Sequence, residues 1–441
     1  MILHTIETSD REEIERQQIR DLKKTVQLVS KKVPFYKEQL EKRGVDEESI
    51  THLVDLQKLP FTTKKDLRNH YPFGLFAADK EDLIRIHASS GTSGKPTIIG
   101  YTRNDIHHWT DIVARAITIA GGKREDLLHN AYGYGLFTGG LGLHGGGEKL
   151  GITVVPVSTG NTDRQITLIE DLKPDVICAT PSYALNIAER MIELGKDPGQ
   201  TSLRYGIFGA EPWSEEMRKT LEKIFNIKAC DIYGLSEVIG PGVAVECHEA
   251  QNGLHIAEDH FLVEVIDPNT LEPLPDGEYG ELVFTSLKKE AIPVLRYRTG
   301  DIASITREKC SCGRTTVRMS RVKGRIDDML IIRGVNVFPS EIEHCLMTMK
   351  ELAPHYQLEL SKRGHLDEIS LKVEMTEDLY AEILQDLQHE RVKRLVKEIM
   401  HHLKTFCLVS MQIEVLAPRS IPRSEGKAVR VIDVRRSSAA K

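Results

Sequence analysis

The segment Ser89–Thr97 gathers residue types that bind phosphate. It reads Ser-Ser-Gly-Thr-Ser-Gly-Lys-Pro-Thr. Glycines let backbone N–H groups come close to an anion, and the hydroxyls and the lysine add hydrogen-bond donors. The segment differs from the P-loop of GTPases, because Ser89 stands where that loop needs glycine and Pro96 where it needs serine or threonine. We predict a phosphate-binding loop here, and a plain surface turn is the alternative.

Cysteines around Cys310-Ser-Cys312 form a second group with ligand chemistry. A Cys-x-Cys turn together with Cys247 and one histidine would give a tetrahedral structural zinc site. His255 and His248 are both candidates for the fourth ligand. The spacing is not that of a standard zinc finger, so four unrelated side chains are the alternative. The remaining cysteines lie in apolar stretches and are expected in the core: Cys178, Cys230, Cys345 and Cys407.

The segment Gly140-Leu-Gly-Leu-His-Gly145 has the glycine spacing of a dinucleotide-binding loop. The residues before it are glycine and aromatic rather than an apolar strand. No acidic residue suited to a ribose follows about 20 residues later. A dehydrogenase is therefore not predicted.

Alternating apolar runs and amphipathic stretches predict the elements that carry these segments. Residues 11–30 have helical spacing, and residues 184–194 read as an amphipathic helix between strands. Strands are expected at residues 152–157, 175–179, 204–208 and 228–232, which suggests βαβ units. Residues 261–266 and 281–285 flank a turn-rich stretch and predict an antiparallel pair. The fold class expected is α/β.

The pattern of predicted strands and helices changes after about Gly324. Strands are expected at residues 329–332, 369–373 and 411–416, with one long charged helix within residues 379–406. This pattern indicates a small α+β domain, and its mobility is an expectation that rests on a family resemblance given below rather than on the pattern. We therefore expect a large α/β domain at residues 1–326 and a C-terminal domain at residues 327–441.

Composition narrows the class of protein. The chain has 441 residues, a formal net charge of −6 and a pI of about 6.3, so general nucleic-acid binding is not expected. It has no run of about 18 apolar residues, so no membrane span is expected. The first residues lack the pattern of a signal peptide. Seven cysteines, an odd number, argue against a secreted disulfide framework and favour the cytoplasm.

Five motifs in order resemble those of the adenylate-forming family, which includes acyl-CoA synthetases, adenylation domains and luciferases. Ser89–Thr97 resembles its phosphate-binding loop, and Asp231–Glu237 its aromatic-Gly-x-Ser/Thr-Glu motif. Tyr297–Asp301 resembles its Thr-Gly-Asp motif and Gly324–Asp328 its hinge motif. Gly426-Lys427 is similar to the motif with the catalytic lysine.

Within that family, several stretches are similar to the phenylacetate–CoA ligases. They are residues 131–140, 233–238, 331–340 and 421–430, and the likeness runs from about residue 33 to 433. It implies ATP-dependent formation of an acyl-adenylate from an aryl acid, most simply phenylacetate, followed by transfer to CoA with release of AMP. His144-Gly-Gly-Gly147 replaces a stretch in which many relatives have a bulkier residue after the histidine, which leaves the acid open.

The resemblance assigns roles to individual residues. Lys427 and Glu237 would be catalytic, the lysine as a point charge between carboxylate and α-phosphate, and Glu237 with Thr92 as Mg²⁺ ligands. Asp327 would be the hinge and Gly334 would line the CoA channel. The acid pocket would contain Tyr132, Phe137 and Gly139. Contacts to ATP would come from Ser90, Gly91, Thr92, Ser93, Gly94, Lys95, Gly209, Ala210, Glu211, Pro212, Asp231, Ile232, Tyr233, Gly234, Asp301 and Arg325. Of these, Tyr233 would stack on adenine, Asp301 would grip the ribose hydroxyls, and Arg325 would donate to the ribose or a phosphate.

Two other functions remain open. One is a ligase for another aromatic acid, or one that passes the adenylate to an amine, a hydroxyl or a carrier-protein thiol. The other is a non-catalytic nucleotide-binding homologue, against which the presence of Lys427, Glu237 and Asp301 argues. The expected ligands are ATP, Mg²⁺, CoA, an aromatic acid and a structural zinc. No nucleic-acid or membrane partner is expected, and a homodimer is one expected assembly.

Overall fold

The computed structural model describes residues 1–89, 96–332, 335–363 and 366–435. The predicted phosphate-binding residues Ser90–Lys95 and the predicted CoA-channel residue Gly334 lie outside the described residues. The chain forms two compact units. The first unit contains Met1–Ala179, Gln200–Ala210 and Ile227–Arg321, and the second contains Thr180–Gly199, Glu211–Asn226 and Val322–Lys441.

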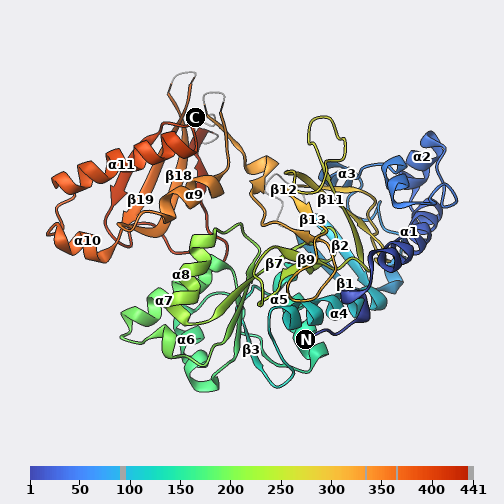
Figure 1. The fold of residues 1–441 in the computed structure, drawn as a ribbon, viewed down its shortest axis with the longest axis horizontal. Coiled ribbons are helices and arrows are strands. Elements are labelled where there is room, and N and C mark those ends of the chain that lie inside the picture. The colour runs from blue at the N-terminus through green and yellow to red at the C-terminus, as the bar shows by residue number, and fades with distance from the viewer. Residues whose placement is uncertain (90–95, 333–334, 364–365, 436–441) are drawn as a thin grey trace. The chain divides into compact units, whose positions relative to one another are not determined.

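The first unit combines helices with three sheets (Figure 1). Its α-helices are α1 (Arg11–Lys32), α2 (Pro34–Arg43), α3 (Lys64–Asn69), α4 (Arg103–Ile119), α5 (Thr138–Leu150) and α6 (Thr162–Leu172). Its strands are β1 (Leu83–Ser89), β2 (Thr97–Thr102), β3 (Leu127–Asn130), β4 (Thr153–Val155), β5 (Val176–Ala179), β6 (Tyr205–Gly209), β7 (Lys228–Leu235), β8 (Gly240–Glu246), β9 (Leu254–Ile256), β10 (Phe261–Ile266), β11 (Gly280–Ser286), β12 (Tyr297–Ala303), β13 (Ile305–Thr306) and β14 (Arg318–Met319).

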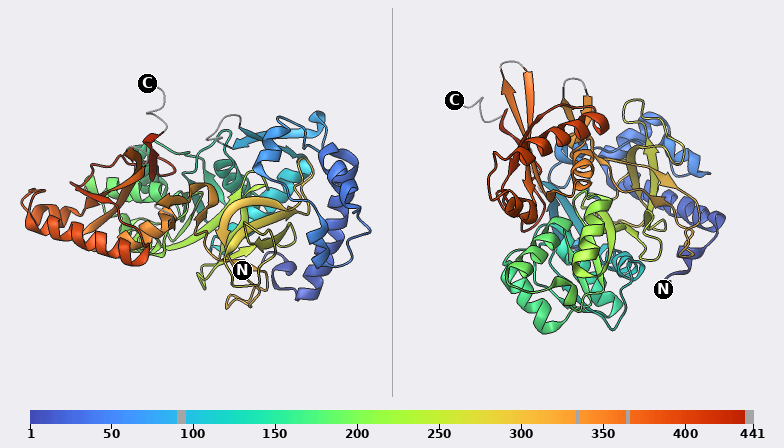
Figure 2. Two further views of the ribbon diagram at one scale, coloured as in Figure 1. Left: turned by 90° about the horizontal axis from the view of Figure 1, so that it is seen from above. Right: turned by 60° about the vertical axis from the view of Figure 1, so that its left-hand side comes forward.

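The N-terminal helix α1 confirms the helix predicted at residues 11–30. Asp10 caps it by accepting a hydrogen bond from the Glu13 backbone N–H at 2.8 Å. Leu22, Val26 and Val29 recur at helical spacing and are fully buried. In Figures 1 and 2, α1 and α2 lie side by side.

The largest sheet has the strand order β13-β14-β9-β8-β7-β6-β5-β3-β4. Strands β4, β3, β5, β6 and β7 run parallel, which confirms the βαβ prediction. The carboxyl ends of parallel strands meet at one edge of a sheet, where ligands bind in open α/β folds. The loops that follow β3, β6 and β7 therefore converge at this edge, and these three loops carry Tyr132, Ala210 and Glu237.

Two antiparallel pairings complete the first unit. Strands β10 and β11 pair with Val263 opposite Phe284, as predicted, and β12 continues that sheet next to β11. Strands β1 and β2 form a separate pair that brings Ser89 opposite Thr97.

Glycines in α5 let this helix pack closely on its neighbours. A Cβ atom at Gly146 would lie 2.3 Å from Val113 Cγ1 in α4, and one at Gly142 would lie 2.5 Å from Pro241 Cγ. A Cβ at Gly145 would lie 2.8 Å from Thr110 Cγ2, also in α4. The glycine-rich departure at residues 144–147 thus changes how closely α5 approaches α4. The glycine pattern rejected above as a dinucleotide loop lies inside this helix.

The second unit joins two helices from the middle of the sequence to the C-terminal segment. Its α-helices are α7 (Pro181–Glu193), α8 (Glu215–Phe225), α9 (Pro339–Met347), α10 (Glu377–Glu382) and α11 (Glu390–Phe406). Its strands are β15 (Gly324–Arg325), β16 (Leu330–Ile332), β17 (Val335–Val337), β18 (Leu352–Arg363), β19 (Leu366–Met375), β20 (Gln412–Leu416) and β21 (Val431–Asp433). Strands β20-β19-β18-β21 form one sheet, and its fully buried residues Leu358 and Leu371 share a core with Ile399 of α11.

The structure corrects one prediction in this unit and confirms three. Strands at residues 329–332, 369–373 and 411–416 are present within or across β16, β19 and β20. The long charged helix predicted within residues 379–406 is α11, but it begins only at Glu390, because the separate helix α10 precedes it. Leu384 and Gln385 take left-handed φ values of 52° and 65°, which end the first helix. Within the described residues, no helix is long and apolar enough to cross a membrane.

Candidate active site and metal centre

Two motifs far apart in the sequence meet in the first unit. The Tyr233 hydroxyl at the end of β7 donates a hydrogen bond to Asp301 Oδ2 in β12 at 2.7 Å. The Tyr233 ring stacks on Phe284 with centroids 6.1 Å apart. Asp301 is 7% exposed. A carboxylate has about four lone-pair positions, so Asp301 can accept from the tyrosine and from further hydroxyl donors.

Strands β6, β7 and β8 approach each other closely at glycine positions. A Cβ atom at Gly209 would lie 2.1 Å from the Ile232 carbonyl oxygen, and one at Gly234 would lie 2.0 Å from the Gly240 carbonyl oxygen. Ala210 follows with a left-handed φ of 68°. The predicted nucleotide-binding segments therefore pack so closely against neighbouring backbone at Gly209 and Gly234 that no larger residue fits at either position.

Asp231 of β7 belongs to a group of charged residues with Glu246 and Arg321. Its backbone N–H donates to Glu246 Oε2 at 3.2 Å. The Arg321 guanidinium lies 3.9 Å from Asp231 Oδ2 and 3.7 Å from Glu246 Oε2. These contacts hold β7 in place, and they give Asp231 a supporting role that its position in the motif did not reveal.

Glu237 lies in the turn between β7 and β8 and is 7% exposed. The neighbouring Ser236 hydroxyl lies 3.0 Å from the Thr138 hydroxyl at the start of α5. A carboxylate at the carboxyl edge of a parallel sheet has the oxygen chemistry that Mg²⁺ prefers. The other predicted magnesium ligand, Thr92, lies outside the described residues.

The loop between β3 and α5 brings the predicted acid-pocket residues together. A Cβ atom at Gly139 would lie 3.1 Å from the Phe137 ring and 3.6 Å from Tyr132 Cβ. Tyr132 is buried, and its hydroxyl donates to the Ile207 carbonyl oxygen at 3.4 Å. Aromatic walls of this kind suit a flat apolar ring.

A polar group beside this loop was missed from the sequence. Asn130 Nδ2 donates to the Tyr134 hydroxyl at 2.8 Å, and that hydroxyl lies 3.2 Å from His144 Nδ1. Burial raises the pKa of the Tyr134 hydroxyl to about 12. Tyr134 shares the glycine- and aromatic-rich segment with Tyr132, and that composition is the signal that could have identified it.

In the second unit, the segment around Lys427 is held by its backbone. The Gly426 carbonyl oxygen accepts from Thr180 Oγ1 at 2.8 Å, and the Ala428 N–H donates to Glu211 Oε2 at 2.8 Å. Ser424 Oγ donates to the Lys427 carbonyl oxygen at 2.7 Å. The Glu211 side chain therefore contacts the lysine segment, a contact that its place in a predicted adenine-flanking motif did not reveal.

The remaining predicted residues of this unit lie in its first elements. Arg325 is in β15, and Asp327 is in the short turn Ile326–Asp328, where its side chain is exposed. A Cβ atom at Gly324 would lie 2.3 Å from Phe338 Cδ1, so this segment packs tightly before the turn. Pro212 follows Glu211 ahead of α8.

Four predicted metal ligands converge in the first unit. The ligand atoms of Cys247, His255, Cys310 and Cys312 all lie within 4.8 Å of one another. Cys247 Sγ and Cys310 Sγ are 3.7 Å apart, and Cys312 Sγ lies 3.4 Å from His255 Nε2. Zinc–sulfur bonds of about 2.3 Å in a tetrahedron put the sulfurs about 3.8 Å apart. The donor set and its spacing therefore fit zinc.

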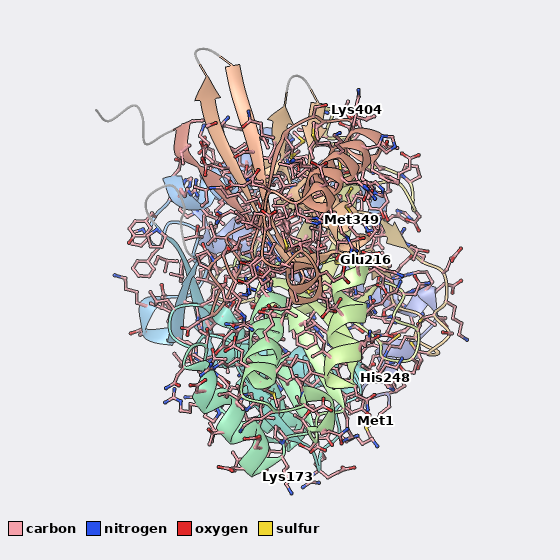
Figure 3. All side chains as sticks on the ribbon, turned by 90° about the vertical axis from the view of Figure 1, so that its left-hand side faces the viewer. Met1, Lys173, Glu216, His248, Met349 and Lys404 are labelled. Carbon is pink, nitrogen blue, oxygen red and sulfur yellow. The ribbon has the colours of Figure 1, made fainter. Side chains whose placement is uncertain are left out.

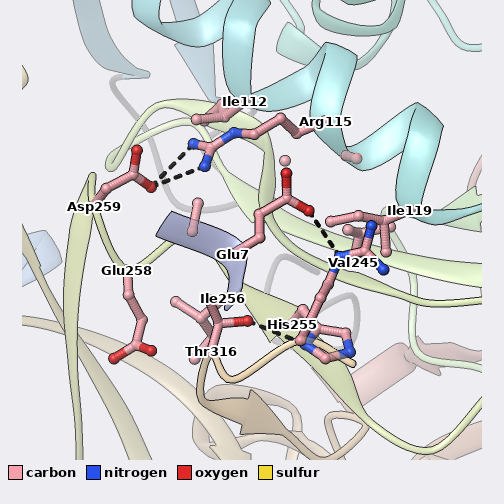
Figure 4. A pocket seen from close by; sticks show the side chains of 14 residues that line it. Glu7, Ile112, Arg115, Ile119, Val245, His255, Ile256, Glu258, Asp259 and Thr316 are labelled. Atoms are coloured by element: carbon pink, nitrogen blue, oxygen red, sulfur yellow. Dashed lines mark hydrogen bonds and ion pairs between the residues drawn. The ribbon is translucent and has the colours of Figure 1, made fainter. Parts of the chain in front are cut away.

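Surrounding residues decide which histidine faces the cysteines. His255 Nδ1 lies 3.1 Å from Thr316 Oγ1 (Figure 4), and its Nε2 faces the Cys312 sulfur. His248, labelled in Figure 3, directs Nδ1 to the Ile119 carbonyl oxygen at 3.2 Å instead. Strand β9 supplies His255 opposite Arg318 of β14, a pairing that the sequence did not reveal.

The N-terminal residues fasten the cysteine turn. Arg314 Nε donates to Glu7 Oε2 at 2.7 Å, and the Thr315 N–H donates to the Glu7 carbonyl oxygen at 3.0 Å. Arg314 and Glu7 are both buried. The turn is therefore fixed from outside as well as by the ligand group.

Comparisons with known proteins agree with this arrangement. The AMP-binding enzyme family matches residues 1–287, and the AMP-binding enzyme C-terminal domain matches residues 334–435. The chain belongs to the AMP-binding enzyme family. It is an acid–thiol ligase, and ligases of this kind use ATP, Mg²⁺ and CoA.

Relatives of this ligase resemble it along nearly its whole length. It is 51% identical over 439 residues to phenylacetate-coenzyme A ligase of Thermus thermophilus, covering 98% of this chain and 99% of that protein. It is also 51% identical to the Escherichia coli protein of the same name, over 98% of each chain.

A solved structure shares the fold. 2-Hydroxyisobutyryl-CoA ligase in its postadenylation state is 28% identical, with a TM-score of 0.91 over 98% of this chain and 92% of that chain. The same enzyme in its thioesterification state, with 2-HIB-AMP and CoA, gives a TM-score of 0.71 at 29% identity over the same shares. That enzyme has therefore been observed in two states of its reaction.

Proposed function

We propose that this ligase is an AMP-forming phenylacetate–CoA ligase, which converts phenylacetate, ATP and CoA into phenylacetyl-CoA, AMP and diphosphate. The observation that carries the proposal is the 51% identity to phenylacetate-coenzyme A ligases over 98% of the chain. The aromatic loop of Tyr132, Phe137 and Gly139 supports an aryl acid.

The first half-reaction activates the acid. A carboxylate oxygen attacks the α-phosphorus, the bond to the β-phosphate oxygen breaks, and diphosphate leaves with the acyl-adenylate formed. No general base is needed, because the carboxylate is already ionised at pH 7. Lys427 would neutralise charge where carboxylate and α-phosphate meet.

The nucleotide would be held by residues from several loops. Ser90, Gly91, Thr92, Ser93, Gly94 and Lys95 would cradle the β- and γ-phosphates, and Gly209, Ala210, Glu211 and Pro212 would flank adenine. Tyr233 would stack on the base beside Asp231, Ile232 and Gly234, whereas Asp301 would accept the ribose hydroxyls and Arg325 would donate to ribose or phosphate. Glu237, with Thr92, would hold Mg²⁺, which neutralises phosphate charge when bound.

The second half-reaction transfers the acyl group. The CoA thiol sulfur attacks the acyl carbon, the thiol proton passes to solvent, and AMP leaves with the electrons of the broken acyl–phosphate anhydride bond. We propose that residues 327–441 act as a mobile domain relative to residues 1–326, with Asp327 as the hinge and Gly334 at the CoA channel. The two observed states of 2-hydroxyisobutyryl-CoA ligase support such alternation.

We also infer one structural zinc ion bound by Cys247, His255, Cys310 and Cys312. Four protein ligands leave no open position, so the ion would stabilise the fold and take no part in acyl transfer. Support comes from the 3.7 Å and 3.4 Å ligand separations and from the hydrogen bond to His255.

The proposal includes the cellular compartment and the oligomeric state of the enzyme. None of its seven cysteines, all of which are described, forms a disulfide, which favours the reducing cytoplasm. A homodimer is the proposed assembly, and light scattering during size-exclusion chromatography would measure it.

Product analysis tests the reaction. Phenylacetate, ATP, Mg²⁺ and CoA should yield phenylacetyl-CoA, AMP and diphosphate by mass spectrometry, and omission of CoA should leave only adenylate, trapped with hydroxylamine. ADP and phosphate as products would overturn the adenylate route. Thioesters formed only from aliphatic acids would overturn the aryl assignment. An adenylate that CoA does not consume would favour a different acceptor.

A further inference from the structure

The Glu211 carboxylate joins two parts of the second unit. Its Oε1 accepts a hydrogen bond from the Ser182 N–H at 2.8 Å, and its Oε2 accepts one from the Ala428 N–H at 2.8 Å. Ser182 lies in the first turn of α7, where backbone N–H groups lack partners within the helix. The helix dipole also favours a negative charge there. Glu211 is therefore held firmly by α7 while its other oxygen reaches the lysine segment.

Thr180 fastens the same segment from the other side of Lys427. It is the N-cap of α7, with its hydroxyl oxygen accepting from the Tyr183 N–H at 3.3 Å. The same hydroxyl donates to the Gly426 carbonyl oxygen at 2.8 Å. The residue before Lys427 is thus bonded to the N-cap of α7, and the residue after it is linked to the first turn of α7 through Glu211.

Two fixed neighbours set the direction in which the Lys427 side chain leaves the backbone. A lysine side chain has four rotatable carbon–carbon bonds and cannot position its own charge. Misplacement of a catalytic group by about 1 Å can cost about a hundredfold in rate. An anchor on the backbone is therefore the means by which this chain can place the ammonium group.

We propose that Glu211 is a positioning residue that latches the backbone of Lys427 to α7 for the adenylation half-reaction and releases it for thioester formation. The inference rests on the proposed function, because it assigns Lys427 to adenylation. Hydrogen bonds that a carboxylate accepts from backbone N–H groups can be exchanged for bonds to water at small net cost, so the latch can open. In this role the Glu211 carboxylate acts on the Lys427 backbone and not on substrate, whereas the backbone of Glu211 would flank adenine.

A second contact strengthens the segment without touching Lys427. Glu189 in α7 accepts from Arg423 Nε at 2.8 Å, and Asn186 Nδ2 donates to the Ser424 carbonyl oxygen at 3.3 Å. The residues of the lysine segment that make these bonds, Arg423 and Ser424, lie three or more positions before Lys427. They keep the segment near α7, whereas Glu211 and Thr180 fix the residues adjacent to Lys427.

The test measures the two half-reactions separately in Glu211→Gln. A glutamine offers one acceptor oxygen in place of two, so one of the two backbone bonds is lost. The rate of adenylation, measured as phenylacetate-dependent exchange of labelled diphosphate into ATP, should fall about 10- to 100-fold. Conversion of supplied phenylacetyl-adenylate and CoA to thioester should stay within about twofold, and KM for ATP should not rise.

Matched variants separate positioning from simple stability. Glu215→Gln changes an exposed glutamate nearby, whose partner is Arg218 at 3.1 Å, and should leave both half-reactions unchanged. Thr180→Val removes the bond to Gly426 and should slow adenylation selectively, as Glu211→Gln does. Thermal unfolding of each variant reports any loss of fold.

Several results would overturn the latch. Equal slowing of both half-reactions in Glu211→Gln would make the residue structural, and a raised KM for ATP alone would make it a nucleotide contact. No change in adenylation would remove its role. If phenylacetate supports no exchange in the unmodified enzyme, the proposed acid fails, and the same comparison is made with whichever aryl acid does support exchange.

Discussion

The Glu374→Gln substitution tests how the C-terminal loop is anchored to its sheet. Glu374 in β19 is fully buried. Its carboxylate accepts from Arg423 Nη1 at 2.8 Å and Nη2 at 2.9 Å, and from the backbone N–H groups of Arg419 at 3.0 Å and Ile421 at 2.5 Å. Four donors, from Arg419, Ile421 and Arg423, therefore meet one negative charge in the segment just before Lys427.

The expected cost follows from these contacts. In glutamine an NH2 group, which cannot accept a hydrogen bond from these donors, replaces one carboxylate oxygen. At least one hydrogen bond from Arg423 or from the backbone is therefore lost, and the negative charge is removed. Breaking a buried ion pair costs about 3–5 kcal/mol. Arg423 keeps its bond to Glu189, so we expect a loss of about 2–3 kcal/mol. At about 2–4 °C per kcal/mol, the melting temperature of the second unit should fall by about 5–10 °C.

Calorimetry of the variant and of a surface control measures this difference. Glu359→Gln makes the same change in the adjacent strand β18, where Glu359 pairs with Lys372 at 3.0 Å and is about one-third exposed. That surface pair should contribute about 0.5 kcal/mol. If Glu374→Gln lowers the free energy of unfolding no more than Glu359→Gln does, the reasoning about the buried anchor is wrong.

Further predictions concern catalysis, metal and pH. Lys427→Ala should slow adenylation by about two or more orders of magnitude and spare thioester formation from supplied adenylate, as separate half-reaction assays would measure. Asp327→Pro should do the reverse, because proline fixes φ near −65° and restricts the hinge. Elemental analysis should find about one zinc per chain, and Cys312→Ser should lower that content. Burial lowers the pKa of His129 from 6.5 to about 4, so its stabilising contribution, complete above pH 6.5, should fall by about 3 kcal/mol as the pH drops toward 4. His129→Gln should lack that part of the acid slope in denaturant titrations.

A control or a contrary result tests each of these predictions. Equal slowing of both half-reactions by Lys427→Ala would make that lysine structural. Cys407→Ser changes a cysteine outside the ligand group and should keep the zinc content. Stable, active enzyme with less than about a tenth of a zinc per chain would exclude the metal centre. An acid slope in His129→Gln equal to that of the unmodified enzyme would assign the pH effect to other groups.

Much of the fold could be predicted because buried parallel strands leave a strong pattern. The apolar runs that became β5, β6 and β7 are short, and amphipathic stretches separate them, so their βαβ order was readable. The break between α10 and α11 was not, because it depends on left-handed φ values at Leu384 and Gln385 that neither residue type favours.

The site was predictable in its motifs but not in its contacts. Pairing of His255 with β14 distinguishes it from His248, and strand pairing between distant segments is not encoded in local spacing. The same holds for Glu211, whose motif position suggested adenine while its carboxylate bonds to Ser182 and Ala428. Long-range hydrogen bonds of backbone groups carry no side-chain signature in the sequence.

The glycine contacts of α5 bear on how acid preference can evolve or be engineered. This helix begins at Thr138, directly after the Tyr132–Phe137 loop, and rests on α4 through positions without side chains. A methyl group added at Gly146 would displace the whole helix and carry the loop with it. Libraries for new acids should therefore include this buried helix contact as well as the pocket wall, since a distant position can move every wall residue at once.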